Sequence, residues 1–182
     1  MAEVAIRKPA LSGLLAGSAT VRVTVAPVAS RLSLRAPAES VSALSSALGV
    51  ALPTAPKTSG RAAGRSVLWL GPDEWLVIDE AGSDLPALLA GAGALHSAVD
   101  VSHRNVGFIV SGPGAGVTLS AGCPQDLSLE VFPVGACSRT IFGKAEIVLF
   151  RTEDDTFRVE CWRSFSDYVF GLLAEGAEDA GH

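Results

Sequence analysis

Short segments in which apolar and polar residues alternate recur along the whole chain. Residues 20–25 (TVRVTV) and 31–35 (RLSLR) show the period of two that is typical of half-buried strands. The segment SVLWLGPDEWLVIDE predicts two strands on either side of a turn at Gly71, Pro72 and Asp73. Further strands are expected at residues 95–101, 106–110, 139–142, 145–151 and 157–161.

Helical spacing of apolar residues replaces the alternation in four places. After Pro37, one helical face carries Val41, Leu44 and Leu48, and Gly49 is expected to end that helix. Shorter helices are expected at 85–89 and between Gly112 and Gly122. A closing helix is expected to be capped by Ser164 and to bury a stripe made of Phe165, Tyr168, Val169 and Leu172.

The two halves of the chain resemble each other. The segment LRAPAESVSALSSALG and the segment VSGPGAGVTLSAG both run from a strand through a proline into a short helix that stops at glycine. We interpret this as a duplicated unit of strand, helix, two strands and helix. Because strands and helices are short and hairpins frequent, we predict an α+β fold of two small, similar lobes with mainly antiparallel sheets.

This interpretation divides the chain into four parts. Residues 1–18 are expected to form an N-terminal arm, 19–95 the first lobe, 96–176 the second lobe and 177–182 a tail. Within the first lobe, residues 53–65 contain proline, glycine and arginine without an apolar pattern, and predict a flexible loop.

Composition restricts the classes of function. The chain has 182 residues, of which 48% are hydrophobic and 18% charged, and its net charge is −5. No apolar run approaches the roughly 20 residues of a membrane-spanning helix, and no basic cluster suggests nucleic acid as a partner. The high mean hydropathy of +0.38 is instead consistent with a rich core or with surface buried against partner chains.

The N-terminus and the cysteines both indicate a cytoplasmic protein. Arg7 and Lys8 precede a short apolar stretch, but Pro9, Ser12 and Gly13 interrupt it, which argues against a signal peptide. The odd number of cysteines, at Cys123, Cys137 and Cys161, does not suggest a disulfide framework.

Asp100, Val101, Ser102, His103 and Arg104 form the densest polar cluster in the sequence. A Ser–His nucleophile pair is one interpretation, but adjacent residues of an extended chain point to opposite faces. We favour the alternative, a turn at the end of a strand in which Asp100 and Ser102 bond the backbone.

Other candidate sites are weaker. The three cysteines and His103 match no zinc-ligand spacing and are expected to be small core residues. The glycines of SGPGAG lack the spacing of a phosphate-binding loop and indicate a tight connection from strand to helix. For the tryptophans Trp69, Trp75 and Trp162 we expect core or interface roles, not stacking on a pterin or flavin. For the arginines Arg139, Arg151 and Arg163 we expect solvated or inter-subunit ion pairs, not a clamp on a substrate carboxylate.

The segment VDVSHRNVGFIVSGPGA resembles the glycine-cleavage aminomethyltransferases and their folate-binding relatives. Together with LWLGPDEWLV, AGCPQDL, FPVGACSRTIFGK and WRSFSDY, in that order, the chain resembles the gamma subunits of heterotetrameric sarcosine oxidase over residues 65–175. This resemblance implies a complex with alpha, beta and delta subunits that oxidises sarcosine to glycine and hydrogen peroxide and passes the one-carbon unit to tetrahydrofolate or releases formaldehyde. It also implies that FAD, FMN, NAD and zinc belong to the partner subunits and that this chain holds no cofactor or metal.

The same resemblance defines an alternative, a stand-alone folate-dependent aminomethyltransferase. That alternative requires an acidic residue directed at the folate amine, for which Asp100 and Glu146 are the candidates. Lys144 and Ala145 stand where the folate enzymes carry acidic residues, and the bulky Cys161-Trp162-Arg163 stands where they carry a small polar residue. We therefore expect a subunit without catalytic residues.

Overall fold

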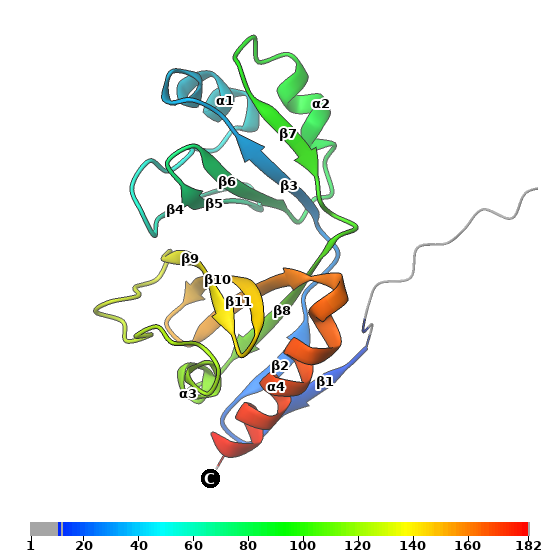
Figure 1. The fold of residues 1–182 in the computed structure, drawn as a ribbon, viewed down its shortest axis with the longest axis vertical. Helices are drawn as coiled ribbons and strands as arrows, with labels where there is room; N and C mark the ends of the chain where they lie inside the picture. The colour runs from blue at the N-terminus through cyan, green and yellow to red at the C-terminus, as the bar shows by residue number, and fades with distance from the viewer. Residues whose placement is uncertain (1–10, 12, 182) are drawn as a thin grey trace, which may run out of the picture.

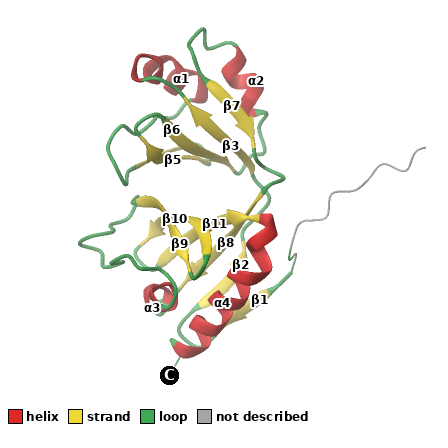
Figure 2. Ribbon diagram, viewed as in Figure 1, coloured by secondary structure: helices red, strands yellow, loops and turns green. Residues whose placement is uncertain are grey.

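A computed structural model describes residues 11 and 13–181. Figure 1 shows two antiparallel sheets that face each other, each with helices on its outer side, so that the molecule has four layers. Figure 2 shows that the helices lie only on these two outer sides. The expected α+β fold with two small lobes and antiparallel sheets is confirmed.

The first sheet has five strands in the order β4-β5-β6-β3-β7. Its strands are β3 (Ser30–Arg35), β4 (Ser59–Ala62), β5 (Arg65–Gly71), β6 (Glu74–Asp79) and β7 (Ser97–Asp100). The 3-10 helix η1 (Ala38–Ser40), α1 (Val41–Leu48) and α2 (Leu85–Ala90) cover its outer face. Leu44 and Leu48 of α1 are buried against this sheet, and Gly49 ends the helix in the left-handed conformation, as the sequence predicts.

The second sheet has six strands in the order β1-β2-β8-β11-β10-β9. Its strands are β1 (Leu15–Gly17), β2 (Arg22–Val25), β8 (Asn105–Ser111), β9 (Cys137–Phe142), β10 (Ala145–Glu153) and β11 (Thr156–Trp162). The outer face carries α3 (Ala115–Ser120), the 3-10 helix η2 (Arg163–Phe165) and α4 (Ser166–Asp179). Phe108, Phe142 and Phe157 are fully buried in the core between this sheet and its helices.

The order of elements in the first half of the described chain recurs in the second half. The first unit runs β2-β3-α1-β4-β5-β6-α2 and the second runs β7-β8-α3-β9-β10-β11-α4, so each has five strands where the predicted unit has three. The leading strand of each unit is exchanged: β2 pairs with β8 of the second unit, and β7 pairs with β3 of the first. Neither unit therefore completes a sheet without the other.

This exchange corrects the predicted boundaries. Residues 22–25 were assigned to the first lobe but pair in the second sheet, and residues 97–100, assigned to the second lobe, pair in the first. The connections from β2 to β3 and from β7 to β8 each cross from one sheet to the other. A division of the chain into consecutive segments cannot represent this crossing. The C-terminal tail is also corrected, because α4 continues to Asp179.

Three local predictions need correction as well. Residues 59–62, predicted as loop, form β4 because Ser59 to Ala62 pair with Leu68 to Arg65 of the neighbouring strand. In the expected arm, Leu15 to Gly17 form β1, while residues 1–10 and 12 lie outside the described residues. The closing helix begins at Ser166 without a side-chain cap, and Ser164 lies in η2.

The buried stripe of α4 is also displaced from the predicted one. Val169 and Leu173 are buried and Leu172 is partly buried, whereas Phe165 and Tyr168 are each 42% exposed. The buried face of α4 begins at Ser166 and continues through Val169 and Leu173.

The two sheets bury a separate apolar layer between them. It contains Leu68, Leu76 and Ile78 from the first sheet and Cys137, Val148 and Phe150 from the second. Ala29 and Val101, which belong to the two crossing connections, complete this layer. The space between the ribbons in Figure 1 is therefore largely filled by side chains.

A buried ion-pair network joins the sheets beside this layer. Arg31 of β3 donates from Nε to Glu160 Oε2 at 2.6 Å and from Nη2 to Oε1 at 3.1 Å. Arg158 donates from Nε to Glu160 at 2.8 Å and from Nη1 to Glu80 at 2.9 Å. Arg31, Arg158 and Glu160 are each at most 5% exposed, so the charges are screened little by solvent.

Gly107 provides the space for this network. A Cβ atom at this position would lie 2.5 Å from Glu160 Oε1 and 3.1 Å from Arg31 Nη2. Since the neighbouring strand pairs Glu160 directly with Gly107, any larger residue there would displace the carboxylate from its arginine partners.

We predict that Glu160→Gln lowers the free energy of unfolding by about 3–5 kcal/mol, because it leaves two buried guanidinium groups without a full counter-charge. Urea denaturation followed by tryptophan fluorescence would measure the change. The control is Asp73→Asn, which breaks the exposed pair with Arg35 (side chains 52% and 59% exposed) and should cost no more than about 1 kcal/mol. Equal effects of the two substitutions would contradict the role assigned to the network.

Candidate functional site

Asp100 ends β7 and has a structural role. Its Oδ1 accepts a hydrogen bond from the Ser102 backbone N–H at 2.8 Å, and Ser102 Oγ accepts one from the Arg31 N–H at 2.8 Å. The interpretation of residues 100–104 as a strand-end turn is thereby confirmed. The turn fixes the connection that carries the chain from the first sheet to the second.

Glu146, the second candidate, lies on β10 opposite Ile141 of β9. Its side chain is 56% exposed and lies 4.0 Å from Arg139 Nε. Glu146 lines a cavity of about 360 Å³ between the two sheets, and Asp100 does not. The structure therefore does not bring the two acidic candidates into one site.

The cavity between the sheets is polar, but its charged groups are already paired. Arg139 forms a two-point ion pair with Glu74, and this hydrogen bonding raises the pKa of the Arg139 guanidinium against the effect of burial. Arg35 pairs with Asp73 at 2.7 Å, and Arg104 stacks 5.2 Å from the Trp162 ring centroid. Because Arg139 holds Glu74, whose side chain is 22% exposed, Glu146 is the more accessible acid of the cavity, with a side chain that is 56% exposed.

The sequence resemblance predicts that Lys144, Ala145 and Cys161 stand where folate enzymes carry functional residues, and the structure places these three residues in a turn and in the core. Lys144 occupies the turn between β9 and β10, where its N–H donates to the Tyr168 hydroxyl at 3.1 Å. Ala145 and Cys161 are buried in the core of the second sheet. Neither side chain offers an acid or base to the cavity.

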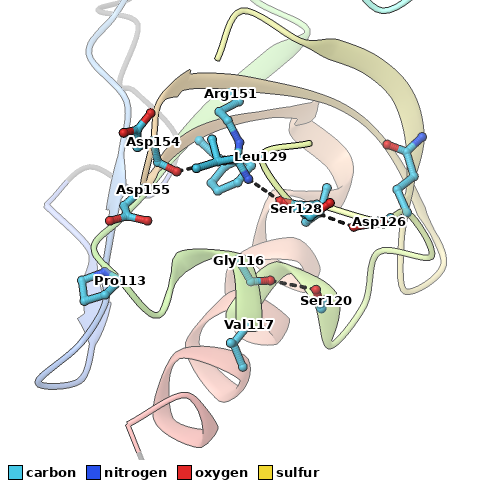
Figure 3. A pocket seen from close by; sticks show the side chains of 13 residues that line it. Pro113, Gly116, Val117, Ser120, Asp126, Ser128, Leu129, Arg151, Asp154 and Asp155 are labelled. Carbon is cyan, nitrogen blue, oxygen red and sulfur yellow. Dashed lines mark hydrogen bonds between the residues drawn. The ribbon is translucent and has the colours of Figure 1, made fainter. Parts of the chain in front are cut away.

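A second cavity, of about 500 Å³, lies beside α3 and the turn between β10 and β11. Figure 3 shows Arg151 on its wall, between Leu129 and Asp154. The guanidinium donates to the backbone carbonyls of Asp154, at 3.0 Å, and Leu127, and it stacks 4.4 Å from the Phe157 ring. Burial lowers the pKa of Arg151, against the opposing effect of Asp154 and Asp155. Arg151 thus links the loop before β9 to the turn between β10 and β11.

The tryptophans differ in exposure. Trp75 is buried and donates from Nε1 to the Pro53 carbonyl at 2.7 Å, while Trp69 packs against the core of the first sheet. Trp162 is 44% exposed and its ring lies 6.3 Å from that of Phe165. Trp75 is therefore a core residue, as expected, and Trp162 is left at the surface.

The cysteines are buried core residues, as the sequence predicts. Burial raises the pKa of Cys137 and that of Cys161 to about 12, so neither thiol ionises near neutral pH. Within the part of the chain that the structure describes, no group of three or more His, Cys, Asp or Glu side chains is placed to hold a metal ion. No helix of the same residues is long and apolar enough to cross a membrane.

Sequence reasoning missed the ion-pair network of Arg31, Arg158 and Glu160. Arg158 and Glu160 alternate with Phe157, Val159 and Cys161, which is the pattern of a strand with one solvated face. Nothing in that pattern reveals that the polar face meets a second sheet. The available signal is that Arg158 and Glu160 carry opposite charges two residues apart, and that Glu160 lies opposite Gly107 of the neighbouring strand. This signal can be recognised only when the strand register is known.

The fold defines a class: a two-sheet α+β domain in which the order of elements is repeated. A crystal structure of glycine cleavage system aminomethyltransferase T from Bartonella henselae matches 90% of this chain and 50% of that one, with a TM-score of 0.64 and 14% identity, which shows the shared fold. Residues 34–179 match the sarcosine oxidase, gamma subunit family, and the chain belongs to this family.

The individual relatives agree with this assignment. Sarcosine oxidase subunit gamma from Corynebacterium sp. (strain P-1) is 32% identical over 63% of this chain, and that from Arthrobacter sp. is 35% identical over 52%. These matches span 57% and 47% of the relatives' own lengths. A chain in the structure of heterotetrameric sarcosine oxidase from Corynebacterium sp. U-96, in complex with pyrrole 2-carboxylate, is 29% identical with a TM-score of 0.85, covering 92% of this chain and 89% of its own.

We predict that Cys137 and Cys161 resist thiol reagents in the folded chain at pH 8, because their thiols are buried and protonated. Labelling with a chromogenic disulfide reagent, followed by peptide mapping, would measure the rate at each cysteine. The control is the chain unfolded in guanidinium chloride, in which all thiols should react quickly. Rapid labelling of Cys137 or Cys161 in the folded chain would contradict the burial described above.

Proposed function

We propose that this chain is the gamma subunit of a cytoplasmic sarcosine oxidase complex and contributes no catalytic side chain. The observation that carries the proposal is the match to a chain of a heterotetrameric sarcosine oxidase over nearly the whole length of both chains. The family assignment over residues 34–179 supports it independently of that single structure.

In this proposal the complex oxidises sarcosine with oxygen to glycine and hydrogen peroxide. The one-carbon unit is released as formaldehyde, with water as co-reactant, or is transferred to tetrahydrofolate. Alpha, beta and delta subunits are the proposed partners, and FAD, FMN, NAD and zinc are proposed to reside in them. The gamma chain stabilises or positions those subunits.

The pairing of charges supports a structural role for this chain. A general acid or base needs an ionisable group within reach of a bound substrate. Here the acids Glu74 and Glu160 are bound to arginines, Asp100 caps a turn, and the sulfur atoms of Cys137 and Cys161 are buried and protonated. Glu146 lies 4.0 Å from Arg139 and shares its cavity with Glu74, which Arg139 binds in a two-point ion pair.

Exposed aromatic residues support assembly with other chains. Trp162 and Phe165 lie in contact at the surface, and Arg104 stacks on the tryptophan. Tryptophan, aromatic and arginine side chains of this kind are over-represented where proteins associate. Arg104 and Trp162 also line the polar cavity, so a partner that covered these side chains would cover the cavity as well.

The alternative function is a stand-alone folate-dependent aminomethyltransferase. The shared fold and the half-exposed Glu146 beside a cavity favour it. The paired charges of the cavity and the turn role of Asp100 argue against it. Tight binding of tetrahydrofolate by the isolated chain, abolished by Glu146→Ala, would establish this alternative.

Purification of the tagged chain from its native cells tests the proposal. We predict a yellow eluate with flavin absorbance, in which larger chains accompany this one and sarcosine yields hydrogen peroxide. A colourless, monodisperse monomer would contradict the subunit role, and folate titration of that monomer would then be the next measurement.

A further inference from the structure

Arg151 differs from the other buried arginines of the described chain. Arg31, Arg151 and Arg158 are each at most 5% exposed. Arg31 and Arg158 both form salt bridges with Glu160, whereas Arg151 forms none with any described residue. Burying a charge is unfavourable unless it is paired with an opposite charge in good geometry. Arg151 therefore lacks the direct anionic partner that the other two arginines have.

The guanidinium of Arg151 also retains an unused hydrogen-bond donor. A guanidinium carries N–H donors on Nε, Nη1 and Nη2. Nη1 donates to the Asp154 carbonyl and Nη2 to the Leu127 carbonyl, both of which are uncharged groups. Nε is buried and has no hydrogen-bond partner among the described residues. A carboxylate would supply both the missing acceptor and the missing negative charge.

The cavity of about 500 Å³ beside α3 gives a ligand a place next to this arginine. Arg151 lines the cavity, as do the apolar side chains of Val117, Leu129 and Phe157 (Figure 3). Val117 and Leu129 are 62% and 50% exposed, so this apolar surface is accessible from solvent. The volume lies within the range of small-molecule sites, about 300–1,000 Å³.

Two carboxylates of the turn between β10 and β11 line the same cavity. Figure 3 shows Asp154 and Asp155 together on one side of it, next to Arg151. Both act electrostatically on Arg151, but neither side chain forms a hydrogen bond or salt bridge with a described residue. A third carboxylate of the lining, that of Asp126, accepts a hydrogen bond from the Ser128 N–H at 2.8 Å. The turn therefore presents two carboxylates that can bind a cation.

The three kinds of group in this cavity require different features of one ligand. The guanidinium requires an anion, the turn carboxylates require a cation and the apolar wall requires a hydrocarbon group. A metal ion would satisfy the carboxylates alone, and no group of three or more His, Cys, Asp or Glu side chains in the described part of the chain is placed to hold one. An α-amino acid with an apolar side chain combines all three features in one small molecule.

We propose that this cavity binds a free α-amino acid with an apolar side chain. The carboxylate of the amino acid accepts from the Arg151 guanidinium, and its ammonium group lies at Asp154 and Asp155. Its side chain packs against Val117 and Leu129. The inference concerns binding alone and goes beyond the proposed function, because it uses only residues of this chain and no partner subunit.

Titration of the full-length chain with leucine at pH 7, followed by amide NMR spectra, tests the proposal. We expect saturable shifts at residues 113–129 and 151–157. Three probes each lack one feature of leucine: glycine lacks the apolar side chain, leucinamide the carboxylate and 4-methylpentanoate the ammonium group. Each is expected to bind about tenfold more weakly than leucine or worse, because it loses apolar burial or a charge-assisted contact.

Two variants change the cavity without touching Arg151. Asp154→Asn combined with Asp155→Asn removes the partners of the ammonium group but no contact of these side chains within the described chain, and should weaken leucine binding about tenfold or more. Val117→Trp fills the cavity and should abolish binding. The matched control is Glu130→Gln combined with Glu153→Gln, which removes the same charge from two exposed residues outside the lining and should leave binding unchanged. Circular dichroism melting checks that each variant is folded.

The possible outcomes are distinct. Saturable leucine binding that follows this order of probes and variants supports the proposal, and its absence overturns it. Equal binding of 4-methylpentanoate would define an anion site only, and equal binding of leucinamide a cation site only, so either result overturns the proposal. Equal effects of the two double substitutions, or shifts confined to residues outside the cavity, overturn it as well. Recovery of an oxidase complex from cells plays no part in these results, so the proposed function can fail or hold independently.

Discussion

The ion pair between Arg31 and Glu160 is the interaction on which the arrangement of the two sheets depends. It joins β3 to β11 across the interface of the sheets, with both side chains nearly excluded from solvent. Burying two such charges is unfavourable unless they meet in good geometry and their remaining hydrogen-bonding capacity is used. Both conditions hold, because Arg31 also donates to the Ala29 carbonyl and Glu160 also accepts from Arg158.

This network constrains orientation more than an apolar contact does. Apolar burial is non-directional, whereas the two-point contact of Arg31 with Glu160 fixes both the distance and the angle between these two side chains. Exchange of β2 and β7 ties the sheets together covalently through residues 26–29 and 101–104. The charged network therefore sets how the two covalently linked sheets face each other. A glycine is needed at position 107 because a Cβ atom there would collide with the Glu160 carboxylate.

The same constraint determines the role of the acids in the space between the sheets. In the space between the sheets, the acids are paired with arginines: Glu160 with Arg31, and Glu74 with Arg139. An acid held in this way stabilises the fold and is not free to take up a proton from a substrate. In this chain these acids serve as contacts between the two sheets.

Local patterns were sufficient to predict most elements of the fold, but not how they combine. The hairpin around Pro72 and the stop of α1 at Gly49 follow from turn and capping chemistry within a few residues. The exchange of β2 and β7 depends on pairing between segments far apart in sequence, which alternation does not encode. The turn at Asp100 and the burial of the cysteines were predictable, because the adjacency of Ser102 and His103 and the spacing of the cysteines argued against a nucleophile pair and a zinc site. The burial of Glu160 was not predictable, since its strand alternates as a solvent-facing one does.

The central claim is that this chain supplies no catalytic group, and turnover of the assembled complex tests it most directly. The measurement is hydrogen peroxide production from sarcosine by the complex that carries the double substitution Asp100→Asn and Glu146→Gln. The account predicts turnover equal to that of the wild-type complex, at equal content of assembled subunits. A loss of about a hundredfold or more, the size expected when a general acid or base is removed, would contradict it.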